Sequence, residues 1–512
     1  MKLARSSQIK EIDSFAINSL GIPAVVLMGR SGVAVANAVR RLCPKGGNVL
    51  ILAGKGNNGG DGYAAACELV GEYEITIVDV FLGGQKTSEG KYYLNEYLSG
   101  GGSIVSIDDV CGGKVNSPDV IVDAIFGTGF FGTPPESLYP LIDLVNSSVA
   151  KRIAVDVPLG INADDGSVHE KAICADVTVS LSYLKPGLLS YPARKYCGEV
   201  ILDTIGMPCD VVENNVPFSN YLFDMDEAVS SLPKRESNSS KGNFGKTLLV
   251  TGSTAYPGAG ILTLEAALRG GAGYVTQVVD SQEIGEYIFH FPEAIFARDL
   301  VSGGELDINS ITELSGKNSS TLVGSGSLES QNLADLVESL IVSEGTPLII
   351  DASAINALAR YKSREVLKSR KREIVLTPHP LEFARLSDLS VEYVQKNRIS
   401  VAKAFAKEYG VILILKGAAT IITDGDTLYI NSTGSSALAK AGSGDVLAGL
   451  LASILAYHRN ALSASALAVY LHGKAGDVLA ERLSKFSVTP SDLPLEIAKV
   501  IREIEKAKGE TS

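Results

Sequence analysis

Short, wholly apolar segments that end in glycine-rich or acidic loops recur along this 512-residue chain, and they constrain its fold more than any other feature. The first is NVLILAG (48–54), which runs into GKGNNGGDG (54–62), then a helix expected from Tyr63 and a second apolar strand, EITIVDVF (74–81). Strand, glycine-rich turn, helix and strand make a βαβ unit, and strands without polar alternation are typical of a parallel sheet buried on both faces. The sequence therefore predicts an α/β fold.

Two more apolar strands in the first half end at acids. Asp123 lies in DVIVDAIFGTGFFGT (119–133), and Asp156 lies in RIAVDVPLG (152–160). Ligands of open α/β sheets bind at the carboxyl ends of the strands, so these two loops and the glycine-rich segment 54–62 are expected to meet in one crevice. The alternative is that each carboxylate only caps a helix that follows it.

The composition narrows the class of protein. The net charge of −12 argues against nucleic acid as the main partner, because binding a phosphate backbone requires clustered Lys and Arg. No apolar run reaches the ~18 residues of a membrane-spanning helix, and the N-terminal MKLARSSQIKEID lacks the apolar core of a signal peptide. We therefore expect a cytoplasmic protein with no membrane partner.

Segment 205–245 separates two regions of α/β character. It contains three prolines and the polar run KRESNSSKGNFG, and the strand–helix alternation restarts at KTLLVTGS (246–253). The predicted organisation is a Rossmann-like, three-layer α/β/α domain over 1–215, a linker over 216–235, and a second α/β domain over 236–512.

The second half contains a phosphate-binding pattern in SSALAKAGSGDVLAG (435–449). Gly442, Ser443 and Gly444 form a turn that enters an apolar helix near Asp445, so that free amides and the helix dipole can hold an anion. A carboxylate beside a phosphate is better suited to act as a base than as an anion ligand. The alternative is an ordinary glycine-rich turn with Asp in the first helical turn.

Three other strand ends in this half have polar side chains. Lys416 follows one strand and could place a cation on a terminal phosphate. His379 lies between two prolines and is expected to face the crevice as a donor, although a lone histidine is more often a core residue. Asp351 could belong to the same crevice or could only cap the next helix.

These motifs resemble known enzyme families. GKTLLVTGS, YPGAG, AALRGGAGYVT, TPHPLE, LKGAAT and AGSGDVLAG are similar to those of the NAD(P)H-hydrate dehydratases, which have the ribokinase-like fold. GNNGGDG, DAIFGTGF, AVDVP and VSLSYLKPG resemble the NAD(P)H-hydrate epimerase domain. The two domains in this order resemble the bifunctional NAD(P)H-hydrate repair enzymes of prokaryotes.

For the first half, the resemblance implies an epimerase that interconverts (R)- and (S)-NAD(P)HX, the hydrated forms of NAD(P)H. Asp156 would be its catalytic residue, and Asn58, Asp123 and Leu159 would hold a potassium ion, the last by its backbone carbonyl alone because a serine is usual there. The residues implied to hold the substrate are Asn57, Asn58, Gly59, Gly60, Asp61, Gly127, Thr128, Gly129, Phe130, Phe131, Gly132, Thr133 and Asp156.

For the second half, the resemblance implies dehydration of (S)-NAD(P)HX at the expense of ADP or ATP with magnesium, with Asp445 as the catalytic base. The substrate would be held by Ala259, Gly326, His379 and Asp445. The nucleotide would be held by Lys416, Gly417, Ala418, Ala419, Thr420, Gly442, Ser443 and Gly444.

The resulting hypothesis is an enzyme that repairs NADHX and NADPHX with ADP or ATP, expected to be a homo-oligomer. The alternative is a small-alcohol kinase of the thiazole or pyridoxal type with an N-terminal binding module, because the Gly-Ser-Gly-Asp turn fits such a kinase equally well. That reading leaves residues 1–210 without a catalytic role.

Overall fold

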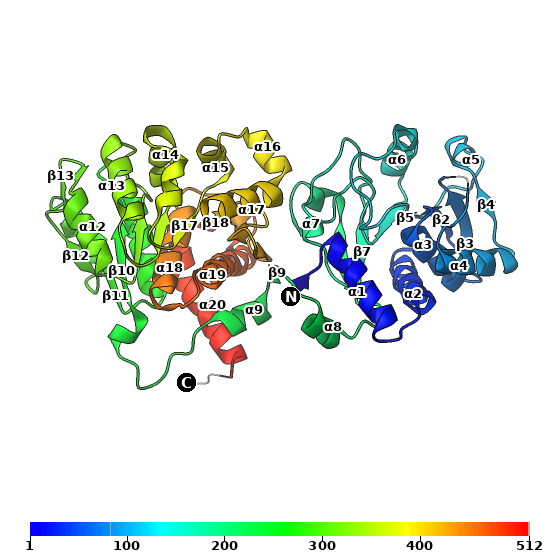
Figure 1. Cartoon of the computed structure of the whole chain (residues 1–512), viewed down its shortest axis with the longest axis horizontal. Helices are drawn as coiled ribbons and strands as arrows, with labels where there is room; N and C mark the ends of the chain where they lie inside the picture. The colour runs from blue at the N-terminus through cyan, green and yellow to red at the C-terminus, as the bar shows by residue number, and fades with distance from the viewer. Residues whose placement is uncertain (82, 510–512) are drawn as a thin grey trace. The chain divides into compact units, whose positions relative to one another are not determined.

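The computed structural model describes residues 1–81 and 83–509, and the chain divides into two compact units. One unit spans Lys2–Asn220, and the other comprises Met1 and the residues from Tyr221 onward. In each unit a mainly parallel sheet lies between layers of helices, so the predicted α/β fold is confirmed (Figure 1). Within the described ranges, no helix has both the length and the apolar character needed to cross a membrane.

The sheet of the N-terminal unit is parallel throughout its described ladder, with the strand order β4-β3-β2-β5-β6-β7-β8. Because this order reverses at β2, the loops after β2 and β5 leave the sheet at a topological switch point, where open α/β sheets bind ligands. The strands are β2 (Asn48–Ala53), β3 (Glu74–Asp79), β4 (Ile104–Val105), β5 (Val120–Ala124), β6 (Lys151–Val155), β7 (Val177–Leu181) and β8 (Glu199–Asp203).

Both faces of this sheet are buried, as the uninterrupted apolar strands predict. In β2, Val49 and Ile51 pack into a core with one set of helices, whereas Leu50 and Leu52 pack into a second core with the other set. The first set is α1 (Ser6–Asn18), α2 (Ala24–Leu42), α3 (Asn57–Leu69), α4 (Ser88–Ser99) and α8 (Cys209–Asn215), and the second set is α5 (Ile107–Cys111) and α6 (Tyr139–Ser147).

Helix α3 begins earlier than the sequence predicts. The segment expected to be a glycine-rich turn as far as Gly62 is helical from Asn57, so the asparagines lie in the first turn of the helix. The glycines let the first turns of α3 lie close against the neighbouring strand ends. A Cβ on Gly59 would lie 1.9 Å from the carbonyl oxygen of Gly54, and one on Gly62 would lie 2.8 Å from the side chain of Ala124. Their small size serves helix packing as much as a turn.

The C-terminal unit is built on a second sheet that contains the strand order β9-β20-β19-β18-β17-β16-β15-β10-β11-β12. Strands from β12 to β18 are parallel, and β18, β19 and β20 are antiparallel neighbours. The strands are β9 (Asn220–Phe223), β10 (Lys246–Val250), β11 (Tyr274–Val278), β12 (Ile295–Ala297), β15 (Ser320–Val323), β16 (Leu348–Ile350), β17 (Ile374–Leu376), β18 (Ile412–Leu415), β19 (Ile421–Thr423) and β20 (Leu428–Asn431).

Helices cover both faces of this second sheet as well (Figure 1). The Ala- and Leu-rich helices near the C-terminus pack with α10 on one face, where they share a large apolar core. These helices are α10 (Pro257–Arg269), α18 (Ser443–Tyr457), α19 (Ala461–Leu483) and α20 (Leu493–Ala507). The other layer contains α12 (Ile308–Gly316), α13 (Gln331–Val342), α14 (Ala352–Tyr361), α15 (Pro380–Ser387), α16 (Val391–Lys396) and α17 (Arg398–Tyr409).

The structure differs from the sequence-based expectation of a linker over 216–235. This segment contains strand β9 and helix α9 (Met225–Ser231). Phe223, Ala228 and Leu232 are buried in the core of the C-terminal unit, and the ring of His458 contacts the backbone carbonyl of Ser231 at 3.0 Å. The prolines and polar residues therefore mark short connections between packed elements.

Helices α10 and α18 approach unusually closely at Gly449, the last residue of the AGSGDVLAG motif. A Cβ on Gly449 would lie 2.1 Å from the backbone carbonyl oxygen of Thr263. The contact is between helix backbones and cannot be relieved by turning a side chain. The position of α18, which begins with the Gly-Ser-Gly turn, therefore depends on this glycine.

We expect Gly449→Ala to lower the free energy of unfolding by about 1–3 kcal/mol, because the added methyl group must push α10 and α18 apart. Gly316→Ala on α12 is the matched control, since its new methyl group meets nothing within 4 Å. That control should leave stability unchanged or raise it by up to ~1 kcal/mol. Equilibrium urea unfolding measures both, and a Gly449→Ala protein as stable as the wild type would contradict the packing argument.

Candidate active sites

The N-terminal unit contains a pocket of about 570 Å³ at the carboxyl ends of its strands. Residues from the three loops singled out in the sequence line it, together with side chains from α1 and α2. The sequence-predicted residues that line it are Asn57, Asn58, Asp61, Gly127, Thr128, Gly129, Phe130 and Asp156.

Other residues predicted for this site do not line the pocket. Gly59 and Gly60 form the packed face of α3, against Gly54 and Met28 respectively. Phe131, Gly132 and Thr133 follow the lining segment 127–130, and the Phe131 side chain is exposed. The structure therefore brings into the pocket Asn57, Asn58 and Asp61 of the first predicted segment and residues 127–130 of the second.

Asp156 has an ion-pair partner that the sequence did not assign. Its carboxylate pairs with the ammonium group of Lys185, which is fully buried. The Lys185 ammonium group also donates to the carbonyl oxygen of Leu181 at 2.7 Å, and the Asp156 carboxylate accepts the N–H groups of Leu181 at 3.2 Å and Thr128 at 3.4 Å. Asp156 adopts a φ of 66°, a left-handed conformation that a non-glycine residue rarely takes and that often marks a functional position.

Asp123 lies deeper, at the end of β5. Its two carboxylate oxygens accept the backbone N–H groups of Ile125 at 3.2 Å and Leu159 at 2.7 Å. Burial raises the pKa of Asp123 to about 7, although these two hydrogen bonds oppose the shift. Asp123 and Leu159 are therefore neighbours, whereas Asn58 shares no hydrogen bond with either of them within the described part of the chain.

Sequence reasoning missed Asp13 on α1 and Lys185 as members of this site. Asp13 lines the pocket, and burial together with the negative charge of Asp156 raises its pKa to about 6. Its only sequence signal was an acid within the apolar stripe of the first helix, IKEIDSFAI. Lys185 lies directly before Pro186 in the segment VSLSYLKPG, where it reads as an ordinary surface lysine.

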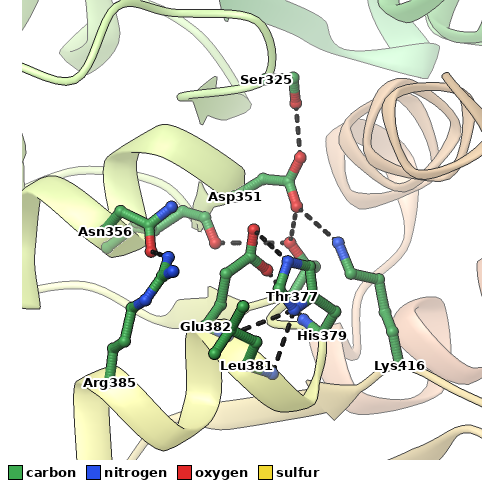
Figure 2. A network of polar contacts seen from close by, with 10 residues as sticks. Ser325, Asp351, Asn356, Thr377, His379, Leu381, Glu382, Arg385 and Lys416 are labelled. Carbon is green, nitrogen blue, oxygen red and sulfur yellow. Dashed lines mark hydrogen bonds and ion pairs between the residues drawn. The ribbon is translucent and has the colours of Figure 1, made fainter. Parts of the chain in front are cut away.

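In the C-terminal unit, polar side chains from four neighbouring strand ends form one network (Figure 2). Asp351 follows β16 and is buried; its carboxylate accepts the hydroxyls of Ser325 at 2.7 Å and Thr377 at 2.6 Å. The Lys416 ammonium group, just after β18, lies 3.1 Å from the same carboxylate. Asp351 therefore holds Lys416 in the crevice and does more than begin α14.

His379 does not act as the free donor that its proline neighbours suggested. Its Nδ1 accepts the backbone N–H groups of Leu381 at 3.1 Å and Glu382 at 3.2 Å, and its Nε2 lies 3.2 Å from the Glu382 carboxylate. Burial lowers the pKa of His379, which favours the neutral ring that can accept these bonds. Nδ1 therefore caps α15 and Nε2 faces the Glu382 carboxylate, so neither nitrogen is the free donor toward the crevice that was expected (Figure 2).

Asp445 lies in the first turn of α18, next to Lys416. Burial, together with the negative charges of Asp351 and Glu382, raises the pKa of Asp445 to about 6, whereas Lys416 acts in the opposite direction. Gly442 precedes α18 with a φ of 98° and provides no side-chain cap. The Ser443 N–H donates to the Lys440 carbonyl at 3.2 Å, whereas the N–H groups of Gly442, Gly444 and Asp445 have no acceptor among the described residues and are open to an anion. A Cβ on Gly444 would lie 3.5 Å from the Lys416 ammonium nitrogen, so the turn and this cation are adjacent.

His472 is another residue near this site that the sequence did not indicate. Its Nε2 lies 3.2 Å from the hydroxyl of Ser443, and burial lowers its pKa to about 4, so the ring is neutral at physiological pH. The buried His472 side chain of α19 therefore holds the Ser443 hydroxyl in position.

The remaining predicted residues flank this crevice. A Cβ on Gly326 would lie 2.4 Å from the Cβ of Ala259, so the two predicted substrate residues are in contact. In the segment from Gly417 to Thr420, the Thr420 hydroxyl donates to the Gly417 carbonyl at 2.9 Å. The buried guanidinium of Arg398 donates to the carbonyl oxygens of Leu415 and Lys416 at 3.1 and 3.2 Å, which fixes the start of this segment.

Comparison with known proteins gives the same division of the chain. Residues 247–499 match the family model of NAD(P)H-hydrate dehydratase, and residues 24–187 match that of the YjeF-related protein N-terminus. A crystal structure of ADP/ATP-dependent NAD(P)H-hydrate dehydratase from Bacillus subtilis, co-crystallised with ATP and Mg²⁺, is similar with a TM-score of 0.51 and 28% identity. The similarity covers 56% of this chain and 98% of that one.

Full-length relatives combine both parts. The bifunctional NAD(P)H-hydrate repair enzyme Nnr of Moorella thermoacetica is 32% identical over 524 residues, covering 99% of this chain and 98% of the relative. The enzyme of the same name from Escherichia coli is 32% identical over 499 residues, covering 97% and 93%. With both sites present and the similarity extending over nearly its whole length, the chain belongs to the family of bifunctional NAD(P)H-hydrate repair enzymes.

Proposed function

We propose that this chain repairs hydrated NAD(P)H in two steps. The N-terminal unit interconverts (R)- and (S)-NAD(P)HX, and the C-terminal unit dehydrates (S)-NAD(P)HX to NAD(P)H while ADP is converted to AMP and phosphate. The observation that carries this proposal is full-length similarity to enzymes named for that repair, in a chain whose two units each have a carboxylate-lined site. The division into an epimerase domain over 1–215 and a dehydratase domain over 236–512 is part of the proposal, and the second domain is extended to begin at Tyr221 so that it includes α9 and most of β9.

Asp445 is the proposed base of the dehydratase. Hydration leaves a hydroxyl on C6 of the nicotinamide ring, and water is a poor leaving group at neutral pH. If Asp445 takes the hydroxyl proton, the oxygen can attack the terminal phosphorus of the nucleotide, and the lone pair of the ring nitrogen then expels phosphate. A carboxyl group whose pKa is about 6 is mostly ionised at neutral pH and can accept that proton.

The nucleotide is proposed to bind over the first turn of α18. The free N–H groups of Gly442 and Gly444 and the ammonium group of Lys416 suit a terminal phosphate, and residues 417–420 would hold the rest of the nucleotide. Magnesium would be held by the nucleotide phosphates beside the carboxylates of Asp351 and Asp445, where it would neutralise charge on the transferred group. Ala259, Gly326 and His379 would contact the dinucleotide substrate.

A potassium ion is proposed near Asp123 in the epimerase. The buried Asp123 carboxylate accepts two backbone N–H groups but has no cationic partner within the described residues. The carbonyl oxygen of the nearby Leu159 accepts the Ile173 N–H at 2.9 Å and keeps a second lone pair for a cation. The side chain of Asn58 is buried as well, and its amide oxygen would be a further ligand. These oxygen-bearing groups fit a cation that would offset the buried charge of Asp123.

A mixture of NADHX epimers distinguishes this function from a kinase with a binding module. We expect complete recovery of the absorbance of NADH with ADP or ATP and magnesium, and none without nucleotide. A small-alcohol kinase would give a stable phosphorylated product instead. Recovery that stops at the fraction initially present as the (S) epimer would contradict the epimerase assignment alone.

We expect Asp445→Asn to lower the dehydration rate by ~10²–10⁴, because the base is lost while the side-chain volume is kept. Nucleotide affinity, measured by calorimetry, should stay within a few-fold of the wild type because the amides of Gly442–Gly444 are untouched. The wild-type rate should fall as the pH drops below about 6, where Asp445 takes up a proton. Collapse of nucleotide affinity in the variant would make Asp445 structural, and an unchanged rate would make another residue the base.

We expect Asp123→Asn to slow epimerisation and to remove any stimulation by potassium, because the variant loses the negative charge but keeps the shape. In the wild type, KCl should also raise the melting temperature of the N-terminal unit relative to NaCl, and this difference should vanish in the variant. Dehydration of purified (S)-NADHX is the internal control and should not change. A wild-type response equal in both salts would contradict the potassium site.

A further inference from the structure

The carboxyl groups that line the N-terminal pocket include three aspartates from different elements. Asp13 lies on α1, Asp61 lies on α3, and Asp156 follows β6. Their interactions differ: Asp156 is paired with Lys185, whereas Asp13 and Asp61 form no ion pair with any group in residues 1–81 and 83–509. Two carboxyl groups that influence one another without a counter-ion cannot both ionise at little cost.

The same pocket bears a sign of a polar ligand that is independent of these acids. The Asn58 side chain lines the pocket and is only 8% exposed, yet its amide nitrogen has no hydrogen-bond partner among the described residues. Buried amide donors are normally satisfied, so this nitrogen indicates that a ligand completes the site. The acids therefore surround a place where a polar molecule binds.

The charges around Asp13 and Asp61 favour a state in which one of these two carboxyl groups keeps its proton. Burial raises the pKa of Asp61 well above its usual value, and the negative charges of Asp156 and Asp13 raise it further; the Ser31 hydroxyl and Lys185 act in the opposite direction. The pKa of Asp13 is about 6, so this carboxyl group is mostly ionised at neutral pH. Other titratable groups also face the pocket or interact with Asp61. They are Lys10 on α1, Lys55 before α3, and Glu89 and Tyr93 on α4.

We propose that Asp61 is the acid of the epimerase, that the carboxylate of Asp13 keeps the proton on Asp61, and that Asp156 is the base. This inference rests on the proposed epimerase function and extends it, because Asp61 was expected only to hold the substrate. Pairs of carboxyl groups held in opposite protonation states in one pocket are how enzymes divide the roles of acid and base.

The step is balanced without an oxidant or reductant. Asp61 gives its proton to the C6 hydroxyl, the C6–O bond breaks, water leaves, and the lone pair of the ring nitrogen forms a C=N bond. Water then adds to the other face of C6, its proton passes to the Asp156 carboxylate, and the C=N electrons return to nitrogen. A proton transferred back to Asp61 through pocket water completes the cycle.

The test uses the full chain and follows epimer interconversion by NMR across the pH range. Asp61→Asn should lower the rate ~10²–10⁴. Asp13→Asn should act through Asp61: removing the negative charge lowers the pKa of Asp61, so the alkaline fall in kcat/KM should move to lower pH. Asp13→Glu should restore the wild-type profile. Glu11→Gln removes an exposed charge from the same helix and is the matched control.

Dehydration of (S)-NADHX by each variant reports whether the rest of the chain is intact, and thermal melting reports on the N-terminal unit. An Asp13→Asn profile that overlies the wild type, or one that falls equally at every pH, would overturn the role of Asp13. Near-normal epimerisation by Asp61→Asn would overturn the acid. A wild type that interconverts no epimers would instead overturn the proposed function itself.

Discussion

Burial of parallel strands on both faces is the constraint on which both sites depend. Helices cover each sheet from two sides, so the interiors of the strands are apolar and charged side chains collect where the strands end. The same connections bring helix N-termini, with their free amides, to that edge. The glycines that let α3 and α18 lie against their neighbours set how closely those amides approach the strand ends.

The two units, with different strand orders, share an electrostatic arrangement. In each, a lysine pairs with a carboxylate at a strand end: Lys185 with Asp156, and Lys416 with Asp351. A further carboxyl group lies nearby without a cation of its own, and burial raises its pKa. One ion pair thus fixes the geometry of the site, and the raised pKa of the remaining carboxyl group suits it to proton exchange.

The sequence could predict the strands and the loops that carry polar residues, because buried parallel strands leave an unmistakable apolar pattern. It could not place the start of α3, since the glycines that resemble a turn are small for the sake of packing against strands distant in sequence. His379 was misread for a related reason: its role as a helix cap depends on Glu382 and on backbone amides that exist only once α15 has formed. Asp13 and Lys185 became visible only when the fold brought α1 and the loop after β7 to one pocket.

Strand β9 has a consequence for any attempt to separate the two activities. The backbone carbonyl of Phe223 in this strand accepts a hydrogen bond from the Ser432 hydroxyl at 2.6 Å, and the Phe223 ring packs into the core of the C-terminal unit. A fragment beginning at residue 236 would leave β20 as an unprotected edge of the sheet, with open backbone groups and an exposed apolar groove where Phe223 belonged. Such an edge invites pairing between molecules, so a soluble, isolated dehydratase half must begin before Asn220 and include the strand that shields it.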